Sequence, residues 1–252
     1  MEVPILSGRP QDYEELGRRL DSLGLERTAT AIVPSPDADP TSADPEVRAR
    51  GVAHLDWALD CATALGAQSL GGPIHAPLGH FTGSGPTEEE LARGGEAHRA
   101  LAERAARSAI FLSLETLNRF ETHFLNTAEQ AIAYVERIGH PACRIMHDTF
   151  HANIEERDPV GAPVALARHL GVLHVSENDR GIPGRGHIPF EAIFSGLKRS
   201  GWDGWVVMEA FGSGLPDIAA ATRVWRPLFP DLDTLWTEGH AYIRRTWESS
   251  GT

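Results

Sequence analysis

Short apolar runs alternate with longer amphipathic segments along most of the 252-residue chain. The short runs have the length and residue types of buried strands, whereas the longer segments repeat apolar positions at helical spacing. Seven strands are predicted, over residues 3–6, 27–33, 69–74, 110–115, 143–148, 171–176 and 204–211. Helices are predicted over residues 12–23, 45–65, 87–108, 126–138, 164–170, 190–199, 216–225 and 233–246. This alternation is typical of a parallel α/β protein.

The strand count favours a TIM (β/α)8-type barrel that lacks its first βα unit, with an open sheet as the alternative. Such a barrel needs eight strands, and this chain begins almost at once in a strand that precedes only six others. No change in composition divides the chain, so residues 1–252 are expected to form a single domain. Residues 34–45 and 73–86 are predicted to be long loops after strands, where barrel enzymes build their active sites. Thr87 and Glu90 form a predicted capping box at the start of the next helix.

The charge balance argues against two classes of partner. The chain has 23 Lys and Arg residues against 35 Asp and Glu residues, a formal net charge of −12 with neutral histidines. A nucleic acid or an anionic membrane surface would favour a basic face instead. Two cysteines, Cys61 and Cys143, are too few for a disulfide framework. With no signal-peptide pattern and no apolar stretch of about 18 residues, a cytoplasmic location is expected.

Four successive predicted strands each carry a potential metal ligand at or near the carboxyl end. The four residues are Glu115, Asp148, His174 and Glu209. Their separations of 33 (115 to 148), 26 (148 to 174) and 35 (174 to 209) residues each match about one βα repeat. In a parallel barrel these side chains would meet at one mouth. Three carboxylates and one imidazole suit a divalent ion such as Mn²⁺ or Mg²⁺, which would also offset the cost of burying Glu115.

Several neighbouring polar residues have other expected roles. Because side chains alternate along a strand, His147 should point away from Asp148 and act as a structural residue. His151 lies in the following loop, and Arg180 lies in the glycine-rich segment 177–186, which has no dinucleotide-binding fingerprint. His75 and His80, in a loop expected over the mouth, are further candidates.

Four segments of the chain resemble the D-tagatose 3-epimerase family of ketose 3-epimerases, which includes L-ribulose and D-allulose (psicose) 3-epimerases. The family belongs to the xylose-isomerase-like barrel superfamily. The segments are "LETLNRFE" (114–121), "HDTFHANIEE" (147–156), "HVSENDRGIPGRG" (174–186) and "VVMEAF" (206–211). The resemblance extends from about residue 2 to the last helix. It implies that the strand near residue 3 corresponds to the family's second strand.

The resemblance assigns roles to seven residues. The metal ligands that it implies are Glu115, Asp148, His174 and Glu209. Glu115 and Glu209 would also be the catalytic acid–base pair, while Glu121, His151 and Arg180 would contact the O1–O3 end of the sugar. The implied reaction interconverts C3 epimers of free ketoses such as L-ribulose, D-fructose and D-tagatose through an enediolate. It would use one divalent ion, with Mn²⁺ first and Co²⁺ or Mg²⁺ as alternatives, and no nucleotide or redox cofactor.

Two other interpretations remain open at the level of sequence. One is another metal-dependent isomerase of the same superfamily, such as a hydroxypyruvate isomerase-like enzyme. The other is a non-catalytic sugar-binding barrel made inactive by loss of the first unit. A multi-zinc endonuclease of the superfamily would need more histidine ligands and a basic surface. The family resemblance implies a homodimer or a homotetramer.

Overall fold

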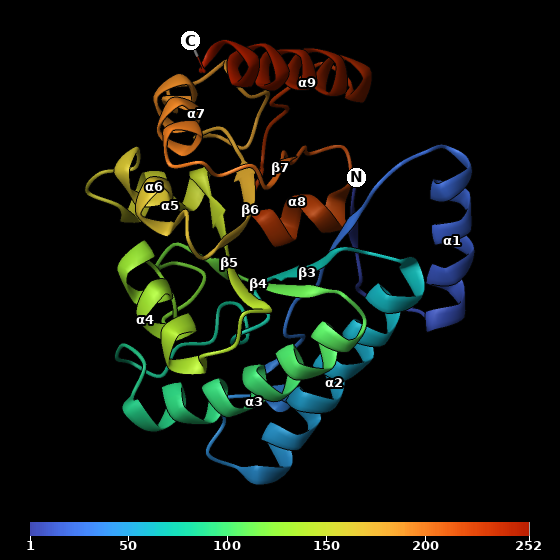
Figure 1. Ribbon diagram of the computed structural model, residues 1–252, viewed down its shortest axis with the longest axis vertical. Coiled ribbons are helices and arrows are strands. Elements are labelled where there is room, and N and C mark those ends of the chain that lie inside the picture. The colour runs from blue at the N-terminus through green and yellow to red at the C-terminus, as the bar shows by residue number, and fades with distance from the viewer. Residues whose placement is uncertain (252) are drawn as a thin grey trace. The chain divides into compact units, whose positions relative to one another are not determined.

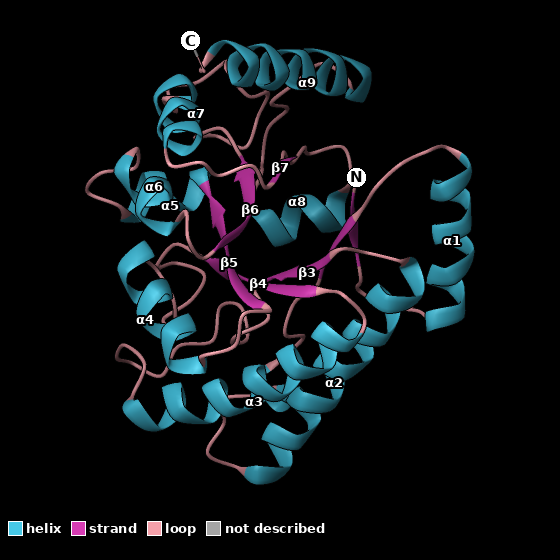
Figure 2. Cartoon of the chain, in the orientation of Figure 1, coloured by secondary structure: helices cyan, strands magenta, loops and turns pink. Residues whose placement is uncertain are grey.

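A computed structural model describes residues 1–251 as alternating strands and helices (Figures 1 and 2). The strands form one sheet in chain order from β1 to β7, and the pairings β1–β2, β2–β3, β3–β4 and β6–β7 are parallel. The strands are β1 Glu2–Pro4, β2 Thr28–Thr30, β3 Ser69–Gly72, β4 Phe111–Thr116, β5 Cys143–Asp148, β6 Leu170–Val175 and β7 Trp205–Met208. The helices are α1 Pro10–Ser22, α2 Pro45–Leu65, α3 Glu88–Arg107, α4 Ala128–Ile138, α5 Thr149–Glu155, α6 Gly161–Leu166, α7 Phe190–Arg199, α8 Pro216–Thr222 and α9 Leu232–Ser249, with a 3-10 turn η1 at Pro36–Ala38.

The described residues divide into two compact units, whose boundary falls within β5 and β6. Unit 1 consists of Met1–Met146 and His169–Gly171, and unit 2 holds the rest of the described chain. Seven strands in chain order confirm the predicted α/β class. That residues 1–252 act as one domain stays a prediction.

Unit 1 carries β1 to β4 with α1 to α4, and all four residues of β3 are buried. Ala29, Leu70, Leu112 and Leu114 are fully buried, as expected for parallel strands that are covered on both sides. The helix starts are set locally. The predicted capping box of α3 is confirmed, because the Thr87 hydroxyl accepts from the Glu90 amide while the Glu90 carboxylate accepts from the Thr87 amide.

Unit 2 holds its outer helices together through aromatic packing. Phe194 of α7 meets Trp247 of α9 with ring centroids 5.4 Å apart, and Trp202 lies 6.1 Å from the same indole. Such edge-to-face pairs stabilise by about 1 kcal/mol beyond their buried area. The six residues of β6 are all buried, whereas those of β7 are half-buried.

The structure corrects several predicted boundaries. Strands β2 and β7 are shorter than the predicted 27–33 and 204–211, although single backbone hydrogen bonds continue beyond them, such as that from the Val33 amide to the Pro73 carbonyl (3.1 Å). Helix α5 was expected to be loop. It forms because the Asp148 carboxylate accepts from the amides of Phe150 and His151 and thereby caps a short helix directly after β5. The helix predicted over 164–170 is wrong at both ends, since α6 spans Gly161–Leu166 and Leu170 already belongs to β6.

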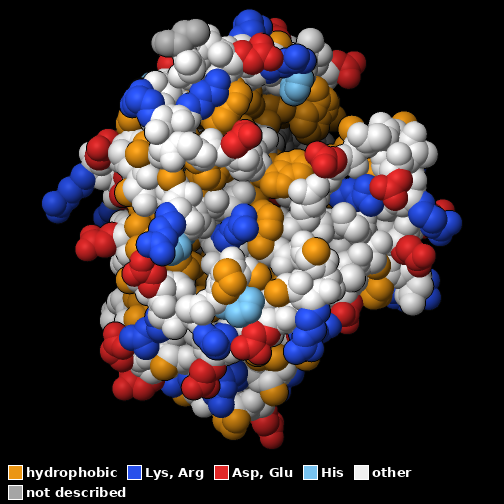
Figure 3. All heavy atoms as spheres, viewed as in Figure 1, with side chains coloured by type: hydrophobic (Ala, Val, Ile, Leu, Met, Phe, Trp, Pro, Cys, Tyr) orange, Lys and Arg blue, Asp and Glu red, His pale blue; other side chains and the backbone are white. Residues whose placement is uncertain are grey.

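Helix hydropathy and the distribution of charged side chains describe the surface. Among residues 1–251, no helix is long and apolar enough to cross a membrane. Acidic and basic side chains are intermixed on the face drawn in Figure 3. That face therefore offers no continuous basic surface of the kind that binds a phosphate backbone.

Candidate functional site

Asp148, at the end of β5, is a fully buried carboxylate with four donors. Its Oδ2 accepts from Ser176 Oγ (2.8 Å) and from Arg180 Nη1 (2.8 Å), and its Oδ1 accepts from the amides of Phe150 (2.6 Å) and His151 (3.3 Å). Burial alone would raise the pKa of Asp148. The Arg180 guanidinium, aided by His174 and His151, outweighs that effect and holds the pKa of Asp148 well below its usual value. Asp148 is therefore ionised at neutral pH, as a metal ligand must be.

Arg180 links Asp148 to Glu209 at the end of β7. Its Nη1 also donates to Glu209 Oε2 (2.6 Å) and Ser176 Oγ (2.9 Å), and its guanidinium lies 4.0 Å from the Phe150 ring centroid. The Arg180 backbone has a φ of +67°, which L-residues adopt at some cost. This conformation gives the 9% exposed side chain its inward position beside both carboxylates.

Glu177 organises the loop that presents Arg180, and sequence reasoning missed this role. Its buried carboxylate accepts three backbone amides, those of Asn178 (3.1 Å), Gly184 (2.9 Å) and Ile188 (3.0 Å). A β-carbon at Gly186 would lie 2.1 Å from Asn178 Oδ1 and 2.4 Å from Glu177 Oε1, so a larger residue there would displace these two side chains. The glycine-rich loop is thus folded around the Glu177 carboxylate. The sequence signal for this role was a glutamate directly after a buried strand.

His151 packs against Arg180 as a neutral ring. Its Nε2 lies 3.0 Å from Arg180 Nη2, and because guanidinium groups only donate, this nitrogen accepts. Burial, reinforced by the charge of Arg180, lowers the pKa of His151 to about 3. The predicted substrate contacts His151 and Arg180 are therefore brought together, directly beside Asp148 and Glu209.

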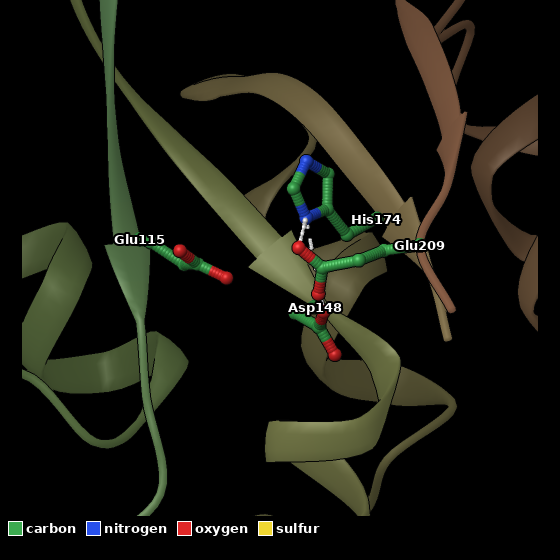
Figure 4. Close-up of side chains that lie close together, drawn as sticks. All are labelled: Glu115, Asp148, His174 and Glu209. Atoms are coloured by element: carbon green, nitrogen blue, oxygen red, sulfur yellow. Dashed lines mark ion pairs between the residues drawn. The ribbon is translucent and has the colours of Figure 1, made fainter. Parts of the chain in front are cut away.

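His174, on β6, faces two of these carboxylates at distances longer than a hydrogen bond. Its Nδ1 lies 3.7 Å from Asp148 Oδ2 and 3.6 Å from Glu209 Oε1 (Figure 4). The His174 side chain is 1% exposed, while that of Glu209 is 24% exposed. Glu209 is thus the member of this trio that solvent or a substrate reaches.

All four predicted metal ligands lie close together. One ligand atom from each of Glu115, Asp148, His174 and Glu209 lies within 4.8 Å of the others (Figure 4). Two ligand atoms on opposite sides of one ion, at bonds of about 2.2 Å, are about 4.4 Å apart. Three carboxylates and an imidazole are also the donor set that Mn²⁺ or Mg²⁺ accepts. The group therefore fits a single divalent ion.

Glu121, the third predicted substrate contact, has a separate local environment. Its Oε1 accepts from Asn118 Nδ2 (2.9 Å), and its backbone carbonyl accepts from the Gly79 amide (2.8 Å). Glu121 does not belong to the four-ligand group. Its role toward a substrate stays a prediction.

Comparison with known proteins decides the family. Residues 4–245 match the family model described as "Xylose isomerase-like TIM barrel". The chain belongs to this family. The predicted barrel fold is thereby confirmed, with seven strands in the part of the chain that the structure describes.

Within the xylose isomerase-like family, the chain belongs with the ketose 3-epimerases. It is 35% identical over 246 residues to the ketose 3-epimerase of Arthrobacter globiformis. The aligned region covers 97% of this chain and 84% of that protein. A solved L-ribulose 3-epimerase structure superposes with a TM-score of 0.92 at 33% identity, over 99% of this chain and 84% of the other. A D-allulose 3-epimerase from Methylomonas sp., solved in complex with D-allulose, superposes with a TM-score of 0.90 at 31% identity. The match covers 97% of this chain and 85% of the other. The resemblance inferred from the four sequence segments is confirmed.

Because several histidines are buried and neutral, the free energy of unfolding of this protein is expected to fall as the pH is lowered. Burial lowers the pKa of His75 and His151 to about 3 and that of His147 to about 4. Below pH 6.5 the unfolded chain takes up protons that the folded chain cannot, so the stabilisation is fully present above pH 6.5 and falls as the pH drops. Each histidine should remove about 2 kcal/mol from the free energy of unfolding between pH 7.5 and pH 5.

Urea unfolding of the chelator-treated protein at these two pH values measures this loss. The His147→Gln variant should lose about 2 kcal/mol less than the wild type over the same interval. His187→Gln, at an exposed position, is the control and should match the wild type. An equal loss in His147→Gln and the wild type would rule out a buried neutral His147.

Proposed function

We propose that this protein is a metal-dependent ketose 3-epimerase, which interconverts the C3 epimers of free ketoses. The observation that carries the proposal is the buried Glu115, Asp148, His174 and Glu209 group in a chain of this family. The proposal gives this group one divalent ion. We propose Mn²⁺ as this ion, with Co²⁺ and Mg²⁺ as alternatives.

The proposed chemistry is proton transfer at C3. The C2 carbonyl of a ketose weakly acidifies the C3 proton, and removal of that proton gives an enediolate. A divalent ion in the site would supply Lewis-acid polarisation of the substrate oxygens. Glu115 and Glu209 form the acid–base pair, in which one carboxylate removes the C3 proton and the other delivers a proton to the opposite face.

Arg180 prepares Glu209 for this role. By donating to Glu209 Oε2, it fixes the orientation of the carboxylate, whose Oε1 faces His174. Fixed orientation of a catalytic carboxylate contributes to rate because less reorganisation is needed when the substrate arrives. We propose that Arg180, together with His151 and Glu121, also contacts the O1–O3 end of the sugar.

The finer parts of the proposal come from relatives and from the family resemblance. Proteins similar to this chain are named L-ribulose 3-epimerase and D-psicose 3-epimerase, so ketopentoses and ketohexoses are the proposed substrates. The proposal includes a single catalytic domain, a homodimer or homotetramer, and a cytoplasmic location.

Incubation with sugars tests the proposed function. The purified protein with Mn²⁺ is supplied separately with L-ribulose, D-fructose and D-tagatose, and products are separated by chromatography beside a chelated control. The proposal predicts a C3 epimer of at least one sugar that appears only with metal. Sugar binding without any epimer, in protein that holds Mn²⁺, would support a sugar-binding barrel instead.

Removing His151 should weaken sugar binding more than it disturbs the fold. His151→Ala takes away the acceptor beside Arg180 Nη2, and a hydrogen bond to a charged group contributes about 1.5–3 kcal/mol. We expect kcat/KM to fall roughly 10- to 100-fold, mainly through KM. His187→Ala, at an exposed position further along the Arg180 loop, is the control. Unchanged kcat and KM in His151→Ala would remove His151 from the site.

A further inference from the structure

Strand β3 ends before it can pair with all of β4. Its last register pair is Gly72 with Leu114, and Glu115 follows one residue later. Gly72 has a φ of +101°, a conformation that favours glycine, and the chain turns sharply there, with the Ile74 amide bonded to the Gly72 carbonyl (2.8 Å). The main chain of β3 therefore does not continue alongside Glu115.

A histidine side chain, rather than the main chain of β3, hydrogen-bonds to the backbone of Glu115. His75 Nε2 lies 2.9 Å from the Glu115 carbonyl oxygen, and both residues are buried. Since a carbonyl only accepts, the ring carries its proton on Nε2. Because both groups are buried, water competes little for this hydrogen bond.

The His75 ring is itself held on its flat face. It stacks on Phe124, with centroids 5.4 Å apart and planes at 14°, and Tyr134 meets Phe124 edge-on at 5.2 Å and 89°. These rings are almost wholly buried, so an aromatic stack fixes the imidazole plane.

The backbone next to His75 is fixed by a second histidine. His98 Nε2 lies 3.0 Å from the Ile74 carbonyl, and His98 Nδ1 lies 2.8 Å from the Tyr134 hydroxyl. The carbonyl must accept, so His98 donates from Nε2 and accepts the tyrosine proton at Nδ1. A β-carbon at Gly94 would come 2.5 Å from the Tyr134 hydroxyl, so glycine leaves room for this bond. Thus α3 and α4 hold both the ring and the peptide of the residue that binds Glu115.

We propose that His75 is a positioning residue for Glu115, which fixes the peptide of that glutamate and so aims its carboxylate. The inference rests on the proposed role of Glu115 as metal ligand and acid–base group. The buried histidines of this cluster are not a second metal site. Among residues 1–251, the one group of three or more closely spaced ligand side chains is Glu115, Asp148, His174 and Glu209.

Two replacements separate the hydrogen bond from the packing. His75→Phe keeps a ring to stack on Phe124 but loses the donor, whereas His75→Gln keeps a donor at similar reach and loses the ring. His54→Phe is the matched control. His54 Nε2 also lies within hydrogen-bond distance of a backbone carbonyl just after a strand, that of Ile32 (2.9 Å), but the strand is β2, which carries no proposed ligand. Each folded variant is assayed for kcat, KM and the dissociation constant of Mn²⁺ measured by titration calorimetry.

Loss of the donor should affect turnover and metal affinity together. Residues that orient metal ligands typically contribute 10- to 100-fold, so His75→Phe should lower kcat by about that factor and weaken Mn²⁺ binding about tenfold. KM should change less than about threefold, and His75→Gln should recover to within about fivefold of the wild type. His54→Phe should keep kcat and Mn²⁺ affinity within about twofold, whatever it loses in stability.

Three results would overturn the positioning role. They are wild-type kcat and Mn²⁺ affinity in His75→Phe, equal losses in the phenylalanine and glutamine variants, and a loss in His54→Phe as large as in His75→Phe. If His75→Phe does not unfold cooperatively, His75→Asn, which is too short to reach the carbonyl, takes its place against His75→Gln. If the wild type epimerises no ketose, the proposed function fails, and the Mn²⁺ affinities of the same variants still decide the role of His75.

Discussion

Replacing Glu209 with glutamine is expected to lower the kcat for ketose epimerisation by roughly 10²- to 10⁴-fold, the usual contribution of a positioned general acid or base. The amide cannot take a proton from carbon, yet its oxygen can still accept from Arg180 Nη1, so the surrounding contacts are kept. Glu115→Gln should cause a loss of the same order. It removes the partner carboxylate, and a two-sided proton transfer needs both.

Kinetics at saturating Mn²⁺ and thermal unfolding of each variant measure this effect. The fold should survive, because glutamine has nearly the shape of glutamate and the side chain of Glu209 is 24% exposed. Arg185→Gln is a surface control, since Arg185 pairs with the exposed Glu238 (2.5 Å) and neither residue belongs to the four-ligand group. A kcat within tenfold of the wild type in either glutamate variant would show that the acid–base assignment is wrong.

Asp148→Asn should lose both metal affinity and stability. The substitution keeps the shape of the side chain but removes the negative charge that faces Arg180, and breaking a buried charged pair costs about 3–5 kcal/mol. The depressed pKa of Asp148 means that its stabilisation is present above pH 3.8 and disappears as the pH falls further. Urea unfolding at pH 7, with chelator and with Mn²⁺, should show a lower free energy of unfolding and little added stabilisation by the metal.

Asp44→Asn is the matched control for that experiment. Asp44 caps α2 by accepting from the amides of Glu46 and Val47, as Asp148 caps α5, but it lies on the surface without a buried charge partner. Asparagine caps helices about as well as aspartate, so this variant should stay within about 0.5 kcal/mol of the wild type. If Asp148→Asn loses no more than Asp44→Asn and retains Mn²⁺ affinity, Asp148 is neither a ligand nor the partner that Arg180 requires.

The strands and the convergence of Glu115, Asp148, His174 and Glu209 could be predicted from the sequence because both follow from local pattern. Each of these four residues stands at or next to the end of an apolar run, and parallel strands bring such ends to one edge of a sheet. The same logic could not find α5, since that helix depends on the Asp148 cap more than on an amphipathic repeat.

The contacts that orient the site could not be predicted from the sequence. Ser176 reaches Asp148 across 28 residues, and His75 reaches Glu115 across 40. Neither pair has a characteristic spacing, because each joins a residue at the end of one strand to a residue in the loop after another strand. In the sequence, His75 is one of two histidines in a predicted loop after a strand. Its proposed role depends on the end of β3 pairing at Gly72, which the sequence does not indicate.

The central claim is that carboxylates exchange the C3 proton of a ketose, and deuterium labelling tests it most directly. The protein and Mn²⁺ are incubated with L-ribulose in D₂O, and the C3 signals of substrate and product are followed by NMR beside a chelated sample. The account predicts an epimer that carries deuterium at C3, formed only with metal, since the carboxylate that delivers the proton draws it from solvent. An epimer that retains its original C3 hydrogen, or equal exchange in the chelated sample, would contradict it.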